Sequence, residues 1–343
     1  MTSPLLTRPG AVAAEAPDTE IAAHYGEMFQ EQRALDRGAG WVDRSNRGVV
    51  RVSGPDRLGW LHDLTSQHLR ELAPGTATET LVMDANGRIK HHLSVVDDGT
   101  ALWAHVEPGT AEELVAFLQS MRFMLRVEVD DLGAERAVVT VAGPDRAAVL
   151  DAVRDSLPPE TVLRPAADET DLFLPAAALV EVTEALTAAG ARPAGLWAYE
   201  ARRIAAHRPR FGIDTDHRAI AHEMGWIGSA VHLDKGCYPG QETVARVHNL
   251  GRPPRRLVML HLDGTAERLP ARGADIELDG RSVGFVGSSA RHFELGPIAL
   301  GLVKRTVPVD AEFVVDGIAA AQEVVVSPDT GANAQIALRR RPH

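Results

Sequence analysis

The sequence predicts an α+β protein in which two mixed or antiparallel α+β units precede a C-terminal antiparallel β-barrel. The first observation is that strand-like runs alternate with helix-like runs in the first part of the 343-residue chain. The second is an internal repeat: residues 50–57 and 139–146 each run from a strand through Gly-Pro-Asp into a helix start. The third is a change after Arg255 to short strands and closely spaced glycine turns, which is typical of a small barrel.

The first α+β unit is expected over residues 21–135, after a flexible leader at 1–20 that is rich in proline and alanine. Apolar residues near helical spacing predict its first helix, and Pro55 marks the start of its second. Asp-Ala-Asn-Gly and Asp-Asp-Gly turns join three strands as hairpins. The expected helices cover residues 20–38, 57–63 and 110–121, and the expected strands cover residues 41–52, 76–83, 88–96, 101–106 and 125–131.

The second α+β unit is expected over residues 136–194, and a return segment that packs on both units follows over residues 195–252. Pro175 suits the first turn of a helix. The barrel is expected over residues 253–328, and a loose tail over residues 329–343. In these parts the expected helices cover residues 175–189 and 196–207, and the expected strands cover residues 171–174, 256–262, 274–278, 281–286, 298–303 and 312–315.

Composition narrows the class of protein. A formal net charge of −11 argues against strong nucleic-acid binding, which needs cations to neutralise phosphates. A single cysteine excludes an internal disulfide and a complete internal cysteine-ligated metal site, and four scattered histidines, His217, His222, His232 and His248, match no zinc spacing. No apolar run approaches the roughly 20 residues of a membrane span, so we expect a cytoplasmic protein without a membrane partner or a stably bound metal.

The single cysteine, Cys237, lies in the most distinctive stretch of the chain. A strand-like run at 229–234 leads into this stretch and a helix-like run at 242–248 leads out. Glycines on both sides permit a tight turn, and the cations Lys235 and Arg246 favour a thiolate at the start of a helix. The alternative is a cysteine that packs as a small buried hydrophobe. The octet reads Lys235-Gly236-Cys237-Tyr238-Pro239-Gly240-Gln241-Glu242.

This octet, followed by Val-Ala-Arg, resembles the signature of the YgfZ-type folate-binding proteins, which are relatives of the glycine-cleavage aminomethyltransferase, the T-protein. Other stretches of the same pattern occur in the right order from about residue 35 to residue 325. They lie at residues 35–37, 41–45, 49–56, 64–66, 83–89, 195–204, 209–214, 285–290 and 298–304.

The resemblance implies an aminomethyltransferase-like multi-domain fold around a central cavity, with tetrahydrofolate or a derivative as cofactor. It also implies a role in iron–sulfur cluster assembly or repair, with client enzymes that include tRNA-modifying ones, and assembly factors as partners. Cys237 would be the functional thiol, and Lys235 would lower its pKa. The remaining motif positions are Gly236, Tyr238, Gly240, Gln241, Glu242 and Arg246, and the expected cofactor contacts are Tyr199, Arg203, Trp226 and His91.

Two departures from the aminomethyltransferase pattern bear on the chemistry. The acidic pair that serves the T-protein reaction corresponds to His91-His92, and the folate-contacting glutamate corresponds to Ala205, whose methyl group accepts no hydrogen bond. Glycine cleavage is therefore not expected, and the departure at Ala205 speaks against unaltered folate binding. Adjacent strand residues point to opposite faces, so at most one of the two histidines faces the central cavity; a solvent-facing histidine beside a satisfied one is the simpler interpretation.

Three functions remain open from the sequence. The first is the folate-binding-like accessory protein with Cys237 as functional thiol. The second is a folate-dependent one-carbon transferase or demethylase on an unknown substrate, for which His91 or His92 would supply the general acid or base. The third is a non-catalytic scaffold in which the cysteine is packed.

Overall fold

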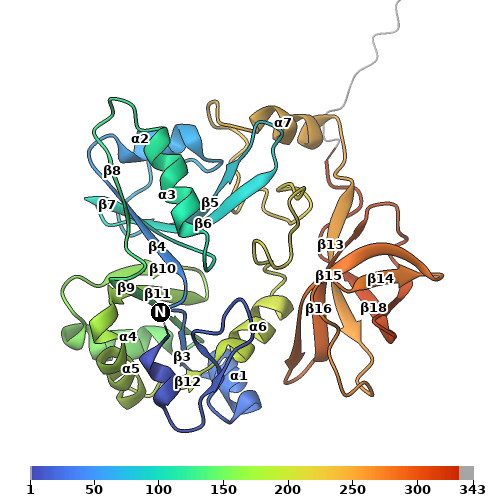
Figure 1. Cartoon of the computed structure of the whole chain (residues 1–343), viewed down its shortest axis with the longest axis horizontal. Coiled ribbons are helices and arrows are strands. Elements are labelled where there is room, and N and C mark those ends of the chain that lie inside the picture. The colour runs from blue at the N-terminus through green and yellow to red at the C-terminus, as the bar shows by residue number, and fades with distance from the viewer. Residues whose placement is uncertain (1, 332–343) are drawn as a thin grey trace, which may run out of the picture.

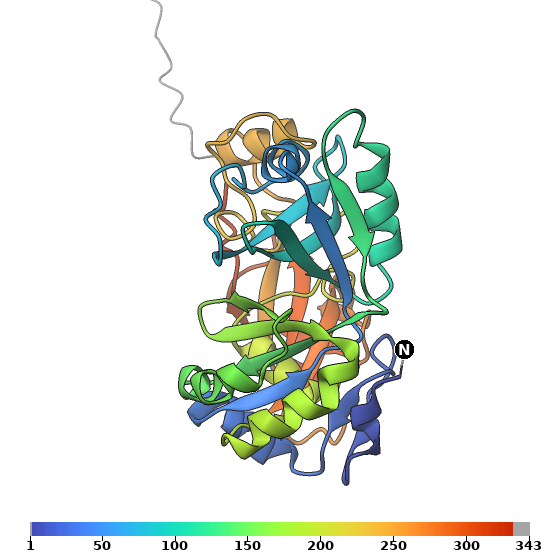
Figure 2. The same cartoon turned by 90° about the vertical axis from the view of Figure 1, so that its left-hand side faces the viewer.

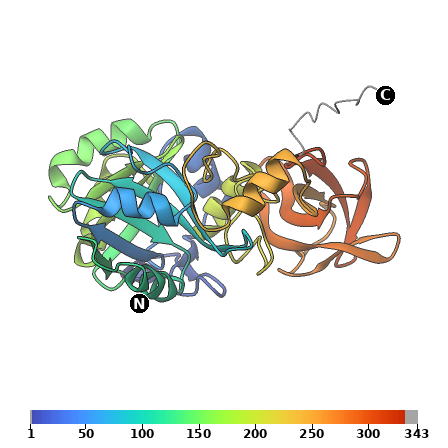
Figure 3. The ribbon, with the colours of Figure 1, turned by 90° about the horizontal axis from the view of Figure 1, so that it is seen from above.

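The structure is a computed structural model that describes residues 2–331, so the expected tail at 329–343 lies outside the described residues from 332 onward. Two five-stranded sheets lie one above the other, and a closed six-stranded barrel stands beside them (Figures 1 and 2). The helix α7 (Gln241–Asn249) lies between the first sheet and the barrel (Figure 3). Within the described part of the chain, none of the helices combines the length and apolar character that crossing a membrane requires.

The first sheet is antiparallel throughout and carries two helices, α2 (Arg57–Leu64) and α3 (Ala111–Ser120). Its inner face is aliphatic, and side chains such as Val50 and Leu93 pack with Leu61 and Leu114 from the helices. Burial of this apolar surface fixes the helices on one face of the sheet. The strand order is β5 (Ala77–Met83), β6 (Ile89–Asp97), β7 (Ala101–Val106), β4 (Gly48–Ser53) and β8 (Glu128–Asp131).

The second sheet draws one strand, β3 (Gly40–Asp43), from an early part of the chain, between α1 (Met28–Arg37) and β4. Strand β3 pairs parallel with β12 (Arg192–Ala194) and antiparallel with β9 (Arg136–Ala142), so the two sheets are connected near residue 43 as well as near residue 136. Its core contains Trp41 and Leu186. The order is β10 (Val162–Pro165), β11 (Glu169–Pro175), β9 (Arg136–Ala142), β3 and β12 (Arg192–Ala194); the associated helices are α1 (Met28–Arg37), α4 (Arg146–Val153), α5 (Leu179–Ala188), and the short 3₁₀ turns η2 (Arg154–Ser156) and η3 (Ala176–Ala178).

The glycine of the repeated Gly-Pro-Asp sequence is required for the same structural reason in both sheets. Gly54 has φ +102° and an added Cβ would lie 2.1 Å from the carbonyl oxygen of Arg126. Gly143 has φ +107° and an added Cβ would lie 2.3 Å from the carbonyl oxygen of Gly38. Both the positive φ and the close backbone approach require glycine, so each strand can turn into its helix only with this residue.

The barrel closes through antiparallel pairing of its first strand with both the fourth and the last strand in sequence. Five of its strands match the expected ones, and the sixth, at residues 318–324, was not predicted from the sequence. Its interior is filled by aliphatic side chains and Phe313. The order around the barrel is β13 (Arg255–Leu262), β16 (Gly296–Lys304), β15 (Arg281–His292), β14 (Asp275–Leu278), β17 (Glu312–Val315) and β18 (Ile318–Val324).

The leader is ordered rather than flexible, which corrects the expectation for residues 1–20. Leu5 is buried in the core of the second sheet, and strand β1 (Val12–Ala13) pairs with β2 (Ala22–His24). The helix expected from residue 20 therefore starts only at Met28. A short 3₁₀ turn, η1 (Pro4–Thr7), begins the leader, and the helix expected at 196–207 is α6 (Leu196–Ala205).

A buried ion network centred on Arg210 ties the leader to the rest of the protein. Its guanidinium donates to Asp18 of the leader, to Glu107 after β7 and to Glu200 of α6, at 2.8–3.2 Å. Burial raises the pKa of Glu200, but the charges of Arg203 and Arg210 outweigh it and lower the pKa to about 2. Glu200 thus stays ionised although it is largely shielded from water.

Replacement of Arg210 by methionine leaves three carboxylates without their common cation in a buried setting. Removing one member of a buried ion pair costs about 3–5 kcal/mol, and we expect Arg210→Met to lower the free energy of unfolding by that amount. Urea unfolding followed by circular dichroism measures it. The control is Arg218→Met, because the Arg218 side chain is 64% exposed and its change should cost no more than about 0.5 kcal/mol. Equal losses in both variants would contradict the assignment of the network.

Candidate functional site

The octet forms a loop that is bound to the C-terminal end of α2 and leads into α7. Cys237 is exposed on this loop, so the alternative of a packed cysteine is not what the structure shows. The strand expected at 229–234 is absent: only Val231 forms an isolated bridge, and the segment is otherwise made of turns. Its backbone groups bond instead to the loop after α2, where Ser66 Oγ donates to the carbonyl of Ala230 at 2.7 Å.

Lys235 anchors the octet to the end of α2. Its ammonium donates to the backbone carbonyl oxygens of His62, Thr65 and Gln67, and it lies 4.7 Å from the ring centroid of Tyr238. The last carbonyls of a helix lack intrahelical partners and favour a cation, so Lys235 satisfies them. Burial lowers the pKa of Lys235 to about 8. The structure thus gives this side chain a holding role, and its effect on the thiol stays a prediction.

Gly240 locks the octet against the turn between β5 and β6. It has φ +82°, and an added Cβ would lie 2.8 Å from both the carbonyl oxygen of Asp84 and the Cα of Gly87. Gly87 in turn has φ +73°, and its added Cβ would lie 2.8 Å from Thr243. Gly236 has no positive φ and open space around it, so only the second glycine of the motif is structurally required.

The other motif residues divide between core and surface. Tyr238 is buried in the hydrophobic core that joins the first sheet to the barrel. Gln241 Nε2 donates to the carbonyl of Lys235 at 3.2 Å and so closes the turn. Glu242 lies in the first turn of α7 and Arg246 in its last, both exposed. The octet therefore presents an accessible sulfur on a loop whose two ends are fixed.

His92, not His91, faces the centre of the molecule. Its ring stacks on Trp226 at 4.7 Å between centroids with 20° between planes, and its Nε2 lies 3.3 Å from Glu79 Oε2. Burial raises the pKa of Glu79, but the charges of His92 and two nearby arginines outweigh it and lower the pKa to about 2. The pair thus combines an imidazole and an ionised carboxylate beside an aromatic plane.

His91 points to the opposite face of β6, among the side chains packed under α2 and α3. It pairs with Val82, a member of the helix-covered core, and is 3% exposed. Burial lowers its pKa, and its Nδ1 has no hydrogen-bond partner among the described residues. Neither histidine faces solvent, which corrects the simpler interpretation made from the sequence, and the structure separates His91 from Trp226 by the sheet itself.

Tyr199 and Arg203, the other expected cofactor contacts, are buried and fully engaged with protein groups. The Tyr199 hydroxyl accepts from Arg44 Nη1 at 3.0 Å and donates to Glu169 Oε1 at 3.1 Å. Arg203 donates to Glu200, to Asp214 and to the carbonyl of Arg208. Ala205, partly buried, packs against the same core that contains Trp226. Of the expected cofactor contacts, only Trp226 lies beside His92.

Glu79 and Arg208 lie in the same site as His92, because the charges of His92 and Arg208 both lower the pKa of Glu79. Glu79 was not predicted from the sequence. Arg208 Nη1 lies 3.2 Å from carboxylate oxygens of Asp168 and Glu169, whereas its Nε and Nη2 are buried without a hydrogen-bond partner among the described residues. The register of the β5–β6 hairpin places Glu79 on the same face as His92. Glu79 lies opposite Ser94, and Ser94 is two residues from His92 on β6, so that the two share a face. We call Glu79, His92, Arg208 and Trp226 the central site.

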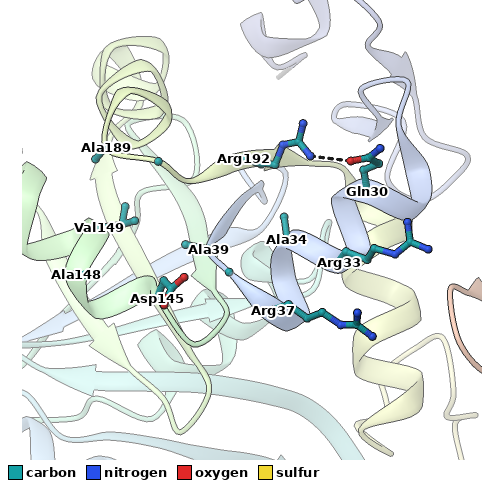
Figure 4. Close-up of a pocket in the computed structure, with 12 residues that line it drawn as sticks. Gln30, Arg33, Ala34, Arg37, Ala39, Asp145, Ala148, Val149, Ala189 and Arg192 are labelled. Carbon is teal, nitrogen blue, oxygen red and sulfur yellow. Dashed lines mark hydrogen bonds between the residues drawn. The ribbon is translucent and has the colours of Figure 1, made fainter.

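A separate cavity of about 500 Å³ lies between α1, α4 and residues 189–192, and no residue of the octet or of the central site lines it (Figure 4). Arg192 donates there to Gln30 at 3.0 Å, and Arg37 extends away from Asp145 toward Glu294. Of its charged groups, Arg37 thus pairs outside the cavity, whereas Arg192 pairs within its lining. Across residues 2–331, no group of three or more histidine, cysteine or acidic side chains is placed to hold a metal ion.

Comparisons with known proteins agree with this architecture. Residues 4–162 match the GCVT N-terminal domain family. A chloroplastic protein of Arabidopsis thaliana, named provisionally as a transferase, is 29% identical over 77% of this chain, which spans 66% of that protein. The aminomethyltransferases of Geobacillus kaustophilus and Parasynechococcus marenigrum are 28% and 26% identical, over 88% and 83% of this chain and 88% and 84% of their own lengths.

The fold itself is that of a solved glycine-cleavage protein. The glycine cleavage system aminomethyltransferase T of Bartonella henselae superposes with a TM-score of 0.79 and 21% identity, over 93% of this chain and 94% of that one. This confirms the expected α+β class with a C-terminal antiparallel barrel. The fold is therefore aminomethyltransferase-like. Residues 4–162 thus resemble the GCVT N-terminal domain, and the chain as a whole is similar in sequence to aminomethyltransferases.

The two glycines of the octet provide a matched test of its geometry. We expect Gly240→Ala to lower the free energy of unfolding by about 1–3 kcal/mol from its positive φ alone, with a further loss from the close approach to Asp84. Gly236→Ala should change it by less than about 0.5 kcal/mol, because nothing lies within 4 Å of the added methyl group. Denaturant unfolding of both variants measures the difference; a Gly240→Ala variant as stable as Gly236→Ala would refute the lock.

Proposed function

We propose that this protein is a YgfZ-type folate-binding accessory protein that supports iron–sulfur cluster assembly or repair in client enzymes, including tRNA-modifying ones. The supporting observation is the exposed Cys237 on a loop fixed by Lys235 before it and Gly240 after it. A reactive group held by rigid neighbours is presented to a partner at little cost in conformational entropy.

Cys237 acts in this proposal as a thiolate that meets a group outside the chain. Iron–sulfur clusters commonly take four cysteine ligands, so one thiolate supplies a single ligand and a client protein, an assembly factor or small thiols supply the others. Lys235 precedes Cys237 in the octet and α7 follows it, so both ends of the cysteine loop are held in place.

In this proposal, tetrahydrofolate or a derivative binds at the central site through contacts that differ from the expected ones. Pterin N–H donors need an acceptor, and the carboxylate of Glu79 supplies one where Ala205 does not. The unpartnered Nε and Nη2 of Arg208 form the edge of the guanidinium that binds two acceptor oxygens side by side, as in a carboxylate. When bound, the folate would supply one-carbon or redox chemistry; Glu79 and Arg208 would hold and orient it.

A folate-dependent one-carbon transferase or demethylase on an unknown substrate is the second candidate. The contact between His92 Nε2 and Glu79 Oε2 supports it, since an imidazole oriented by a carboxylate is a common general acid–base pair. In this case the chemistry takes place at the central site and Cys237 has no direct part.

Complementation of a strain that lacks the gene separates the two candidates. The wild-type chain should restore the activity of an iron–sulfur enzyme, and Cys237→Ser should leave it at the background of the strain because serine is not a thiolate. Arg218→Met, an exposed change, is the control for expression. A Cys237→Ser variant that restores activity fully, while His92→Gln does not, would favour the second candidate and reject the first.

Calorimetric titration with 5-formyltetrahydrofolate tests the central site directly. We expect binding to the wild-type protein and a loss of affinity of about tenfold or more in Glu79→Gln, because losing a hydrogen bond to a charged group costs about 1.5–3 kcal/mol. Trp197→Ala is the control, since Trp197 lies outside the central site and is 43% exposed. Absence of heat with the wild-type protein would reject folate as the ligand.

A further inference from the structure

A second cavity, of about 680 Å³, lies between the leader, α1, α6 and the barrel. No residue of the central site and no residue of the octet lines it. It opens on the face of α6 that carries Trp197 and Glu200, whereas Ala205 on the same helix packs toward the core around Trp226. Cavities that hold small molecules commonly measure about 300–1,000 Å³, so this one has the volume of a ligand site.

One wall of this cavity is apolar and unusually open to solvent. The side chains of Met28, Phe29 and Trp197 are 40%, 46% and 43% exposed, although large apolar side chains usually avoid water. Their grouping in one concave place, with Leu196 and Ile213, indicates a surface that a ring compound would cover. Aromatic side chains bind flat rings by stacking and edge contacts.

The floor of the cavity is polar but closed on itself. Arg210, Asp18 and Glu200 line it, and they satisfy one another within the buried ion network. The floor therefore offers a ligand a rigid surface of fixed shape, but few unpaired hydrogen-bonding groups. The leader segment stays in place as a wall because Asp18 is tied to Arg210.

The barrel side of the mouth carries two arginines without a carboxylate partner among the described residues. Arg272 donates to the carbonyl of Gly212, and Arg291 donates to the carbonyl of Glu267. By contrast, Arg268 on the same side of the barrel is paired with Asp316. The exposed carboxylates of Glu15 and Glu267 also line the mouth, but no ion pair joins either to these arginines, which remain available to an anionic group.

We propose that this cavity is a second small-molecule site, for a compound with an apolar ring system and an anionic group such as a carboxylate or sulfonate. The ring lies against Phe29 and Trp197, and the anion meets Arg272 and Arg291 at the barrel. This site is independent of folate binding at the central site, and its occupant bridges the leader and the barrel.

Two fluorescent probes that differ by one charged group test the proposal. The anion 8-anilinonaphthalene-1-sulfonate should bind the wild-type protein with a stoichiometry of one, about tenfold or more tighter than the neutral N-phenyl-1-naphthylamine, which has the same rings. Trp197→Ala should weaken both probes. The double variant Arg272→Gln/Arg291→Gln should weaken only the anionic probe. Equal affinity for the two probes would overturn the anionic part of the proposal.

Control variants separate this site from other apolar surfaces and from the central site. Phe123→Ala changes an exposed apolar loop outside the cavity, 82% exposed, and should leave the fluorescence titration unaltered. Loss of probe binding in Phe123→Ala, or none in Trp197→Ala, would overturn the location. Displacement of the probe by 5-formyltetrahydrofolate would show one shared site and overturn the proposal, whereas folate binding that Glu79→Gln weakens with the probe unaffected would support it. Thermal midpoints confirm that each variant is folded.

Discussion

The ion pairs of the Arg210 guanidinium connect the parts of the chain that surround the second cavity. The guanidinium joins the leader, the end of β7 and α6, three segments that are distant in the sequence, through carboxylates whose side chains are only 7–13% exposed. Desolvation of so many charges is unfavourable, and the hydrogen bonds offset it only while every partner is present. The network therefore adds to the apolar packing that holds α6, the helix that lines the second cavity and carries Ala205.

Local signals in the sequence predict the class of fold, most hairpins and most of the barrel, because turn chemistry and strand alternation are encoded within a few residues. The leader shows where this reasoning stops. Its proline- and alanine-rich composition indicates a flexible segment. In the structure, however, Leu5 is buried in the core of the second sheet and Asp18 forms an ion pair with Arg210. Likewise, residues 229–234 have a strand-like composition, but their polar backbone groups are satisfied by side chains and carbonyls after α2.

The candidate site could be predicted in part for similar reasons. The octet is a loop before a helix, as its glycines and proline indicate, and the cysteine is exposed. Strand alternation also predicts that His91 and His92 diverge, but not which one faces inward, because this depends on the side that α2 and α3 cover. The role of Lys235 could not be predicted from the sequence. A cation two residues before a cysteine suggests an effect on the thiol, whereas Lys235 binds three carbonyl oxygens at the end of α2, which is remote in the sequence.

The contact between the two glycine turns has a consequence for any exchange of parts between relatives. Gly240 and Gly87 leave room for each other's backbones, and Thr243 fills the remaining space above Gly87. The cysteine loop and the hairpin turn are therefore one inherited unit. A chimera that carries the loop of this chain on a relative's scaffold requires the matching hairpin as well, since a side chain at either glycine would push the sulfur away from its native direction.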